Sequence, residues 1–494
     1  MQNHTTKKAN LKLNIIMGIL NAVINTIVPI LSFIYVTRKL SVDGFGINQF
    51  AYSLVNYFAL FAALGIPLYA NKKLSQIKDN ATEFRKTSSE LFLFNLITAT
   101  IVFIAFVCCI FFLEKTSVNP FIYLIYGFII FGNTFAVEWF YQSTEQFTYI
   151  TIRNFFVKSL TLVAFILFIT KPNDYILYAV ITTFSTLAYA LLNFVRFFKS
   201  VKPTFKNINI KQHLKPVLYV FIFSFTMSLY LFIDNIMIGF IIKENFEYTV
   251  GQYSVATKIP RSIATIISTI NIVLIPRLSY HLVKKDEEKV KNILTNSFSI
   301  LFAWGLSASV GIILLADKII PLFCSVAYLD AIETTKVIAA TIIFIVLIDF
   351  IGIQIFYNNG KAWKSIISCF TGAIIHILTS AILIPKYFHL GAGISNLIGI
   401  VATLIMQIII GYKDMNFKKF TWDNFVSLLS AVVMYIGIMI LDKYIKLSTL
   451  YSLIVLVCIG ILIYLFCLLI FNHKYFKIVL KDIISKIFKK IRSN

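Results

Sequence analysis

Long apolar segments recur along almost the whole chain and are separated by short polar or charged connections. A hydrocarbon core about 30 Å thick needs about 20 apolar residues per helix, and most of the segments approach or exceed that length. No soluble domain could bury so many of them, so the pattern predicts an all-α polytopic membrane protein with about 14 transmembrane helices. We place these spans at residues 12–37, 47–70, 89–113, 120–142, 154–170, 174–195, 216–241, 251–276, 293–316, 334–357, 364–384, 391–412, 424–441 and 449–471. The fifth and the thirteenth are the shortest.

The composition supports a membrane protein. Of the 494 residues, 59% are hydrophobic and only 14% are charged, whereas a typical soluble domain has about 25% charged residues. The net charge of +23 would suggest a nucleic-acid partner if the chain were soluble. Because the basic residues instead gather in alternate connections between the apolar segments, we expect membrane lipids, and no nucleic acid, as partners.

The positions of Lys and Arg predict the orientation of the chain. They precede the first span and return mainly in the even-numbered connections. The largest groups are Lys7, Lys8 and Lys12; Lys72, Lys73, Lys78, Arg85 and Lys86; Arg196, Lys199, Lys202, Lys206, Lys211 and Lys215; and Arg277, Lys284, Lys285, Lys289 and Lys291. Basic connections stay on the cytoplasmic side, so both termini are predicted to be cytoplasmic, as an even number of spans also requires.

Two short patterns occur twice along the chain. One is a Gly and an Ala followed by a basic-Leu-Ser triplet, and the other is an octapeptide that begins Phe-Tyr. Their copies are Gly46, Ala51, Lys73–Ser75 and Phe140–Phe147 in the first half, and Gly251, Ala256, Arg277–Ser279 and Phe356–Trp363 in the second. The two patterns keep their order and have similar offsets, so together they indicate an internal repeat of about six helices.

Such a repeat predicts two parallel six-helix bundles with pseudo-two-fold symmetry about an axis along the membrane normal. We assign residues 1–205 to the N-terminal bundle, 206–415 to the C-terminal bundle and 416–471 to two additional transmembrane helices. Residues 472–494 alternate Lys with apolar side chains, a pattern typical of a basic amphipathic helix on an anionic membrane surface. Two similar bundles can rock against each other, so the symmetry favours transport by alternating access.

Motifs of enzymatic chemistry are missing from the sequence. It has no phosphate-binding Gly loop, no His-Glu-x-x-His or Cys-x-x-Cys zinc pattern and no Gly-x-Ser-x-Gly elbow. We therefore predict no catalytic residue, no metal and no cofactor, and a protein that is not an enzyme.

Charged residues in the seventh and eighth spans are the strongest candidates for a substrate site. Arg261 and Lys258 flank Pro260, which predicts a kinked or opened helix near the middle of the bilayer. A guanidinium can bind a phosphate or pyrophosphate through two parallel hydrogen bonds. Asp234 lies at the level of Lys258 and could form an internal ion pair with it. The alternative is that these cations are structural and are satisfied by helix carbonyl groups.

The remaining ionisable residues in or near the spans suggest gating or ion coupling. Arg38, at the outer end of the first span, could bind substrate at a gate or simply anchor the helix in the interface. Asp349 and His376 lie deep enough to titrate during a proton-coupled cycle. Glu138 could do the same, or its side chain could reach the cytoplasmic surface. For His376 the alternative is a hydrogen bond to a neighbouring helix.

Three segments resemble bacterial O-antigen and capsular polysaccharide flippases, which form the polysaccharide-synthesis family. They are Arg38–Ser75, Glu138–Asn154, and the pair SLYLFIDNIMIG and GQYSVATKI, at 228–239 and 251–259, followed by IPRLS at 275–279. The resemblance covers about residues 10–415 and implies membership of the multidrug/oligosaccharidyl-lipid/polysaccharide exporter superfamily.

The resemblance also implies a substrate and a place of action. The substrate would be an undecaprenyl-pyrophosphate-linked oligosaccharide repeat unit, moved from the inner to the outer leaflet of the bacterial cytoplasmic membrane for O-antigen, capsule or exopolysaccharide assembly. A polysaccharide polymerase and glycosyltransferases would be the partners. Two alternatives stay open. One is an ion-coupled multidrug exporter of the same fold, and the other is a membrane enzyme of polysaccharide assembly.

Overall fold

The computed structural model describes residues 11–117, 119–204, 208–284, 286–415, 417, 421–445, 447–474 and 476. Every regular element in this part of the chain is a helix, which confirms the predicted all-α fold class. Ten of its helical segments are long and apolar enough to cross a membrane. The chain is therefore a multi-pass membrane protein. The predicted basic tail lies almost entirely outside the described residues.

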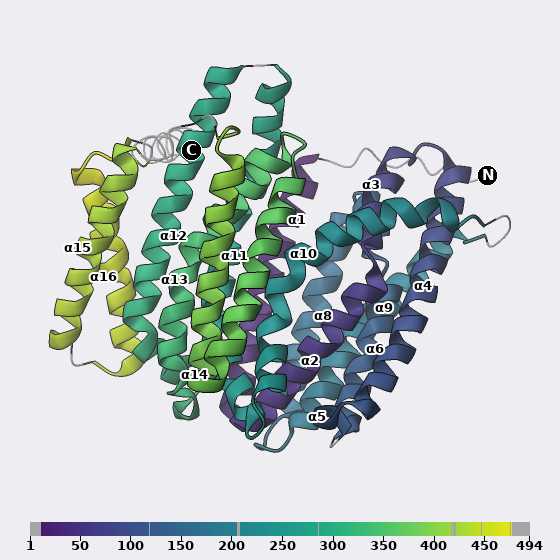
Figure 1. Ribbon diagram of the computed structural model, residues 1–494, viewed down its shortest axis with the longest axis horizontal. Coiled ribbons are helices and arrows are strands. Elements are labelled where there is room, and N and C mark those ends of the chain that lie inside the picture. Colours follow the sequence, from purple (N-terminus) through teal and green to yellow (C-terminus); the bar gives the residue numbers. More distant parts are fainter. Residues whose placement is uncertain are drawn as a thin grey trace, which may run out of the picture. The chain divides into compact units, whose positions relative to one another are not determined.

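Most of the helices are labelled in Figure 1. In chain order, the helices are α1 (Leu11–Lys39), α2 (Val42–Ala63), α3 (Ile66–Gln76), α4 (Ala81–Phe112), α5 (Glu114–Ser117), α6 (Pro120–Ala136), α7 (Glu138–Ser143), α8 (Phe147–Phe168), α9 (Tyr175–Val201), α10 (Lys211–Ile241), α11 (Phe246–Val283), α12 (Glu287–Phe323), the 3-10 turn η1 (Val326–Tyr328), α13 (Ala331–Phe350), the π-helix η2 (Ile351–Tyr357), α14 (Trp363–Gly411), α15 (Trp422–Tyr444) and α16 (Thr449–Ile470).

Each span expected from the sequence coincides with helical residues. The eleventh and twelfth spans both lie within α14, whose backbone changes direction at Phe388 (φ 51°, ψ −128°). The two shortest expected spans correspond to α8, with 22 residues, and α15, with 23 residues. At 1.5 Å per residue both helices are longer than about 30 Å, so each is long enough to cross the hydrocarbon core.

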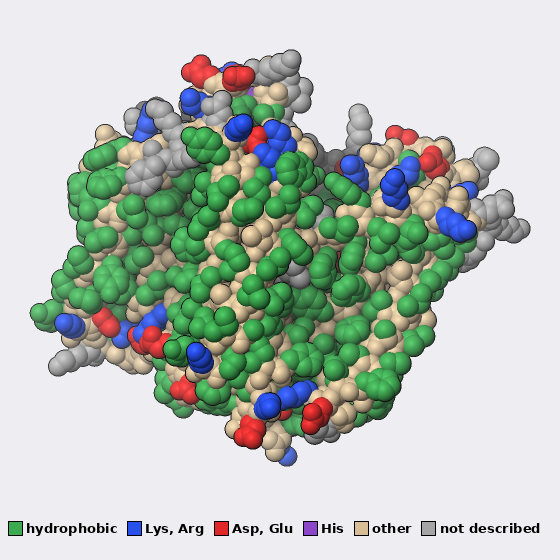
Figure 2. All heavy atoms as spheres, viewed as in Figure 1, with side chains coloured by type: hydrophobic (Ala, Val, Ile, Leu, Met, Phe, Trp, Pro, Cys, Tyr) green, Lys and Arg blue, Asp and Glu red, His purple; other side chains and the backbone are tan. Residues whose placement is uncertain are grey.

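The outer surface of the helices is suited to lipid. Figure 2 shows hydrophobic side chains over most of the visible face, with charged side chains gathered near helix ends. Large side chains stand exposed in mid-helix or at helix ends, among them Phe112 (88%), Phe184 (70%) and Leu160 (66%). Soluble monomers rarely expose apolar surface on this scale, so acyl chains are the natural contact of these faces.

Two of the expected spans are broken by residues with left-handed backbone torsions. The second span divides into α2 and α3 at Leu64 (φ 47°) and Gly65 (φ 74°), and the fourth divides into α6 and α7 at Val137 (φ 40°). Gly65 is needed for a second reason as well. A Cβ atom at this position would lie 2.6 Å from the backbone nitrogen of Phe221, so α10 packs directly on the break.

Both copies of the Phe-Tyr octapeptide contain a turn of the same kind. In the first copy the N–H of Gln146 donates to the carbonyl oxygen of Tyr141 across 2.9 Å, and the intervening Glu145 has a φ of 57°. In the second copy the N–H of Lys361 donates to the carbonyl oxygen of Phe356 across 2.7 Å, and Gly360 has a φ of 69°. This six-to-one hydrogen bond closes a helix C-terminus, and it lies one residue earlier in the second copy than in the first.

Packing divides the chain into two compact units, Met1–Gly251 and Gln252–Asn494. In the first unit α2 packs against α4, α6 and α10, while α1 packs against α8 and α6 against α9. In the second unit α12 packs against α13 and α15, while α13 packs against α14 and α15 against α16. The boundary of the units lies within α11. The division at residues 205 and 415 that the repeat suggests stays a prediction.

Candidate functional site

The break between α6 and α7 places strained and polar groups inside the first unit. Val137 adopts φ 40° and ψ 37°, a region that a β-branched residue strongly disfavours. The side-chain amide of Asn193, on α9, donates to the carbonyl oxygen of Ala136 across 2.5 Å, and Tyr141 donates to the backbone oxygen of Asn193 across 2.7 Å. Backbone strain that the surroundings hold in place is typical of functional sites.

An ion pair lies directly after this break. The Nη2 atom of Arg153, on α8, donates to Oε1 of Glu138 across 2.6 Å. The guanidinium side chain is only 2% exposed, whereas the carboxylate side chain is 40% exposed. Arg153 also donates to Oδ1 of Asn154, from Nε at 3.2 Å and from Nη2 at 2.7 Å. Its Nη1 atom is buried and has no hydrogen-bond partner among the described residues.

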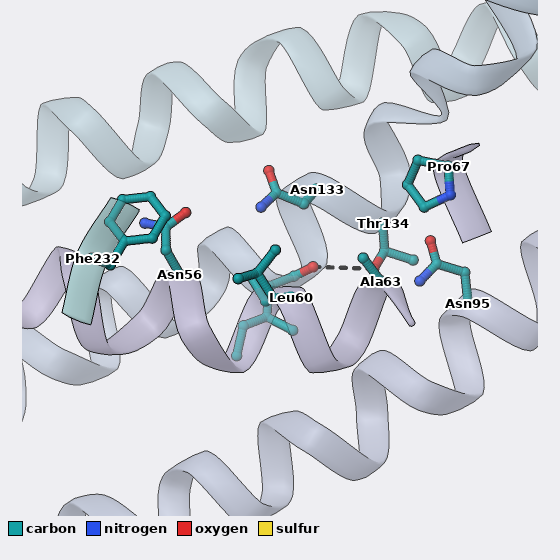
Figure 3. Close-up of a pocket in the computed structure, with 10 residues that line it drawn as sticks. Asn56, Leu60, Ala63, Pro67, Asn95, Asn133, Thr134 and Phe232 are labelled. Carbon is teal, nitrogen blue, oxygen red and sulfur yellow. Dashed lines mark hydrogen bonds between the residues drawn. The ribbon is translucent and has the colours of Figure 1, made fainter. Parts of the chain in front are cut away.

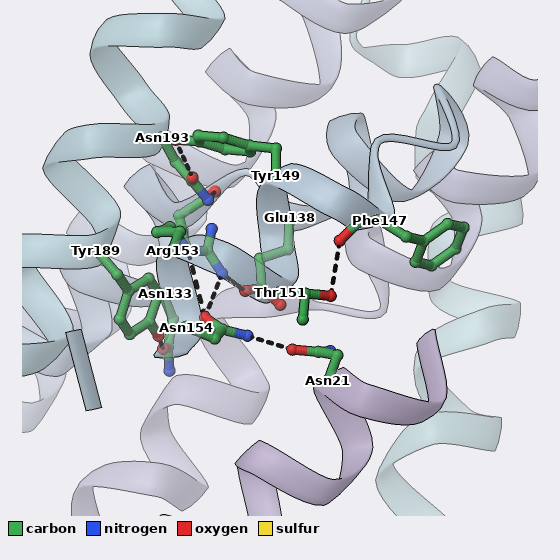
Figure 4. A network of polar contacts seen from close by, with 11 residues as sticks. Asn21, Asn133, Glu138, Phe147, Tyr149, Thr151, Arg153, Asn154, Tyr189 and Asn193 are labelled. Atoms are coloured by element: carbon green, nitrogen blue, oxygen red, sulfur yellow. Dashed lines mark hydrogen bonds and ion pairs between the residues drawn. The ribbon is translucent and has the colours of Figure 1, made fainter. Parts of the chain in front are cut away.

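The polar network continues to α1. Figure 4 shows Asn154 between Arg153 and Asn21, and the amide of Asn154 donates to Oδ1 of Asn21 across 2.8 Å. One turn earlier, the hydroxyl of Thr151 donates to the carbonyl oxygen of Met17 across 2.9 Å. The ion pair is therefore connected to the face along which α1 packs on α8.

Aromatic rings surround the two cationic side chains of this region. The guanidinium carbon of Arg153 lies 5.2 Å from the ring centre of Tyr189 and 5.9 Å from that of Tyr149. Arg196 lies closer to Tyr149, at 4.0 Å, and donates to the side chain of Gln146 across 2.9 Å. Cations within about 6 Å of a ring centre are attracted to its face. The site thus holds the guanidinium groups of Arg153 and Arg196 near the ring of Tyr149, together with the partly exposed carboxylate of Glu138.

A cavity of about 200 Å³ lies in the same unit. Its polar wall is formed by Asn56 of α2, Asn95 of α4, and Asn133 and Thr134 of α6, and Phe232 of α10 closes one end (Figure 3). None of its lining residues is ionisable. The hydroxyl of Tyr189 donates to Oδ1 of Asn133 across 3.4 Å, so the cavity wall and the ring beside Arg153 are connected.

Three of the residues expected from the sequence lie in the first unit. Glu138 pairs with Arg153, as described above, so its carboxylate is committed to a buried guanidinium. Asp234 is buried, at 2% exposure, and its neighbour Asn235 donates to the hydroxyl of Ser53 on α2 across 3.0 Å. Arg38 is exposed in the last turn of α1.

The other expected residues lie in the second unit. Arg261 donates from Nη2 to the hydroxyl of Tyr253 across 3.4 Å. The backbone of α11 stays helical through Pro260, so the helix is not opened there, and a kink at Pro260 stays a prediction. Asp349 accepts a hydrogen bond of 2.5 Å from the hydroxyl of Ser268. His376 is buried where α14 folds back, and a Cβ atom on Gly399 would lie 2.5 Å from that of His376. The ion pair between Asp234 and Lys258 stays a prediction.

Arg153 is the functional candidate that the sequence reasoning missed. The predicted fifth span began at residue 154, which assigned Arg153 to the polar connection before it, but α8 begins at Phe147 and carries the guanidinium inside the unit. The sequence does contain a pattern that predicts the pairing of Arg153 with Glu138. The segment Glu138–Asn154 begins with an acid and ends next to a base, and two helices joined by a tight turn bring such ends together.

Comparisons with known proteins agree with this architecture. The family profile described as "Polysaccharide biosynthesis protein" matches residues 11–282. A curated protein of Escherichia coli (strain K12) named "Putative O-antigen transporter" is 23% identical over 399 residues, which cover 79% of this chain and 94% of that protein.

Solved structures show the same fold. The lipid II flippase MurJ in an inward closed conformation matches with a TM-score of 0.69 and 17% identity, covering 93% of this chain and 98% of MurJ. An inward-facing multidrug resistance MATE family transporter of the MOP superfamily matches with a TM-score of 0.58 and 16% identity, covering 79% and 94% of the two chains. Because the family profile spans more than half of the sequence, this chain belongs to the polysaccharide biosynthesis protein family and has the fold of the multidrug/oligosaccharidyl-lipid/polysaccharide exporter superfamily.

Proposed function

We propose that this chain is a flippase that moves undecaprenyl-pyrophosphate-linked oligosaccharide repeat units from the inner to the outer leaflet by alternating access. The product would feed the assembly of O-antigen, capsule or exopolysaccharide, with a polysaccharide polymerase and glycosyltransferases as partners. The chain would lie in the bacterial cytoplasmic membrane with both termini in the cytoplasm. Transport, rather than catalysis, is the activity that this family membership supports.

The balance of charge at the break between α6 and α7 is the observation that favours this substrate over an organic cation. Two guanidinium groups, those of Arg153 and Arg196, lie around Tyr149, and the carboxylate of Glu138 is already paired with the first of them. Like charges repel strongly where the dielectric constant is low, as it is around the buried Arg153, and more weakly around the exposed Arg196, where water screens them. A substrate that carries phosphate groups is therefore favoured near this site, and an organic cation is not.

We assign the substrate headgroup to Arg261 and Lys258, with Asp234 as a charge partner and Arg38 as a further contact at the outer end of α1. A guanidinium can hold a pyrophosphate through paired hydrogen bonds. For ion coupling the candidates are Asp349, His376 and Glu138. We rank Asp349 first, because its hydrogen bond in the described structure comes from a neutral hydroxyl group, whereas Glu138 is neutralised by Arg153.

A strain that lacks the chain tests the proposed function against the multidrug alternative. We expect lipid-linked oligosaccharide to accumulate on the inner leaflet and surface polysaccharide to be lost, with unchanged tolerance to cationic drugs. Hypersensitivity to such drugs with normal surface polysaccharide would overturn the proposal and favour a multidrug exporter, which has the same fold.

A further inference from the structure

We infer that the cavity of the first unit, lined by Asn56, Asn95, Asn133 and Phe232, binds one neutral, hydroxyl-rich sugar residue of the translocated oligosaccharide. The inference rests on the proposed function and adds to it the part of the substrate that this unit recognises. Five helices contribute to the cavity, namely α2, α3, α4, α6 and α10. It would therefore be sensitive to any rearrangement of these helices during transport.

Two amide groups at the cavity have hydrogen-bonding capacity left over. Asn95 donates from Nδ2 to the carbonyl oxygen of Ala62 across 3.0 Å, and no donor to its Oδ1 atom is found among the described residues. Asn133 accepts from Tyr189 at Oδ1 across 3.4 Å, and its Nδ2 atom has no acceptor within the described part of the chain. The Oδ1 atom of Asn95 is thus available as an acceptor, and the Nδ2 atom of Asn133 is available as a donor. A sugar hydroxyl group donates and accepts at once, so it matches this combination.

The aromatic end of the cavity suits the apolar face of a sugar ring. Phe232 is held in place by two tyrosine rings, with ring centres 6.3 Å away for Tyr52 and 6.2 Å away for Tyr57. Figure 3 shows Phe232 beside Asn56 at one end of the cavity and Asn95 beside Pro67 at the other. The face of an aromatic ring is electron-rich and attracts the C–H groups of a pyranose. The aromatic ring matches the apolar C–H face of a sugar, and the amide groups match its hydroxyl groups.

The size and charge of the cavity limit the ligand further. Its volume of about 200 Å³ lies below the range of about 300–1,000 Å³ that is usual for drug-sized ligands. A single sugar residue of a longer chain is the expected occupant. Since no lining residue is ionisable, a cation or a phosphate would enter without a compensating charge, which is costly in a low-dielectric interior. The lining therefore selects for a neutral residue.

Binding of simple sugars to the purified full-length chain in lipid nanodiscs tests this inference. The probes are neutral methyl hexopyranosides and the corresponding methyl hexuronides, followed by ligand-observed NMR. We expect neutral probes to bind at least about tenfold more tightly than uronides, because a site built for hydroxyl groups discriminates by that much or more. Asn95→Leu and Asn133→Leu should each weaken the binding of neutral probes by about tenfold.

Two further variants, one at the cavity and one control, separate a loss of sugar binding from a loss of folding. Phe232→Leu keeps the wall apolar but removes the ring, and should weaken binding several-fold. Asn71→Leu is the matched control, because Asn71 donates to Gln142 on α7 across 3.4 Å and does not line the cavity. Equal binding by the cavity variants and this control, or preference for the uronides, would overturn the inference.

Translocation of lipid-linked oligosaccharide by the same preparations separates the two proposals. If the wild type translocates this lipid and Asn133→Leu does so equally well, the cavity is not the sugar site, although the flippase proposal stands. If the wild type binds neutral sugars through Asn95 and Asn133 but does not translocate the lipid, the flippase proposal fails and the sugar site stands.

Discussion

The side-chain amide of Asn193 donates to the carbonyl oxygen of Ala136 across 2.5 Å, at the last residue of α6 before its break. The side-chain amide of Asn95 likewise donates to the carbonyl oxygen of Ala62, near the break between α2 and α3, across 3.0 Å. A carbonyl group without a partner inside a membrane protein is costly. Both broken spans of the first unit therefore replace a helix hydrogen bond with an asparagine from a neighbouring helix.

Asn193→Ala should lower the stability of the folded protein. Asn193 is fully buried and also accepts a hydrogen bond from Tyr149 across 3.1 Å, so its removal leaves the carbonyl oxygen of Ala136 and the hydroxyl of Tyr149 without this partner. We expect a loss of about 1–3 kcal/mol in the free energy of unfolding, measured as a lower unfolding temperature in detergent. Asn71→Ala, which removes a longer and less buried hydrogen bond, serves as the control. Equal unfolding temperatures for the two variants would contradict the role given to Asn193.

The two partners of the Glu138–Arg153 pair should differ in their sensitivity to removal. Glu138→Ala leaves a buried guanidinium without its counter-charge, whereas Arg153→Met leaves a carboxylate that is already partly exposed and can reach water. Removing one partner of a buried pair costs more than replacing both. We therefore expect Glu138→Ala to lower the unfolding temperature more than Arg153→Met does, and the double variant to recover part of the loss. A double variant less stable than Glu138→Ala would refute this interpretation.

Gly65 and Gly360 allow backbone strain and crowding to be separated. Both have positive φ angles, 74° and 69°, but an added Cβ atom would meet the backbone of Phe221 only at Gly65, whereas open space surrounds Gly360. Gly360→Ala should cost about 1–2 kcal/mol, the penalty of a left-handed torsion. Gly65→Ala should cost about 1–3 kcal/mol more, because it also overpacks the contact with α10. Chemical unfolding of the two variants measures the difference, and equal losses would show that the contact is absent.

Asp414, in the connection after α14, should make the free energy of unfolding depend on pH only at acidic pH. Asp414 accepts hydrogen bonds from Lys361, across 2.6 Å, and from Lys364. Partial burial raises the pKa of the Asp414 carboxyl, but the two lysines outweigh it and the pKa lies below its ordinary value of 3.8. A lowered pKa stabilises the fold above the ordinary pKa, and this contribution is lost as the pH falls through the lowered value.

Asp414→Asn should therefore be less stable than the wild type by the same amount from about pH 5 to 8, and this difference should shrink below about pH 4. Thermal unfolding across this range measures it. Asp79→Asn, at an exposed position, is the control and should show little difference at any pH. A difference that grows as the pH falls would mean that the sign of the pKa shift is opposite.

The helices could be predicted from the sequence, and the breaks within them could not. An apolar run of about 20 residues can satisfy its backbone in lipid only as a helix, so composition alone was sufficient for α4, α12 or α16. The turn at Val137 has no local signal, because a β-branched residue is an unfavourable choice for a left-handed torsion. It exists because Asn193, more than 50 residues later, holds the freed carbonyl group.

The candidate site was only partly visible in the sequence for a similar reason. Glu138 was recognised as an intramembrane acid, but its partner Arg153 was not, because a charge at the edge of a span is easily assigned to the connection. The cavity depended on Asn56, Asn95 and Asn133, which lie on three different helices. Asparagines in apolar segments are common enough that only the packing of α2, α4 and α6 shows which of them face one another.

Translocation by the purified chain in vesicles tests the central claim most directly. Undecaprenyl-pyrophosphate-linked oligosaccharide is placed in one leaflet, and its arrival in the other is followed by cleavage with an added glycosidase that cannot cross the membrane. The wild type should make the oligosaccharide accessible well above the rate of protein-free vesicles, and Arg261→Ala, at equal protein content, should fall to the rate of the protein-free control. Accessibility at the background rate for the wild type, or an undiminished rate for Arg261→Ala, would contradict the account of a flippase that carries its anionic headgroup on Arg261.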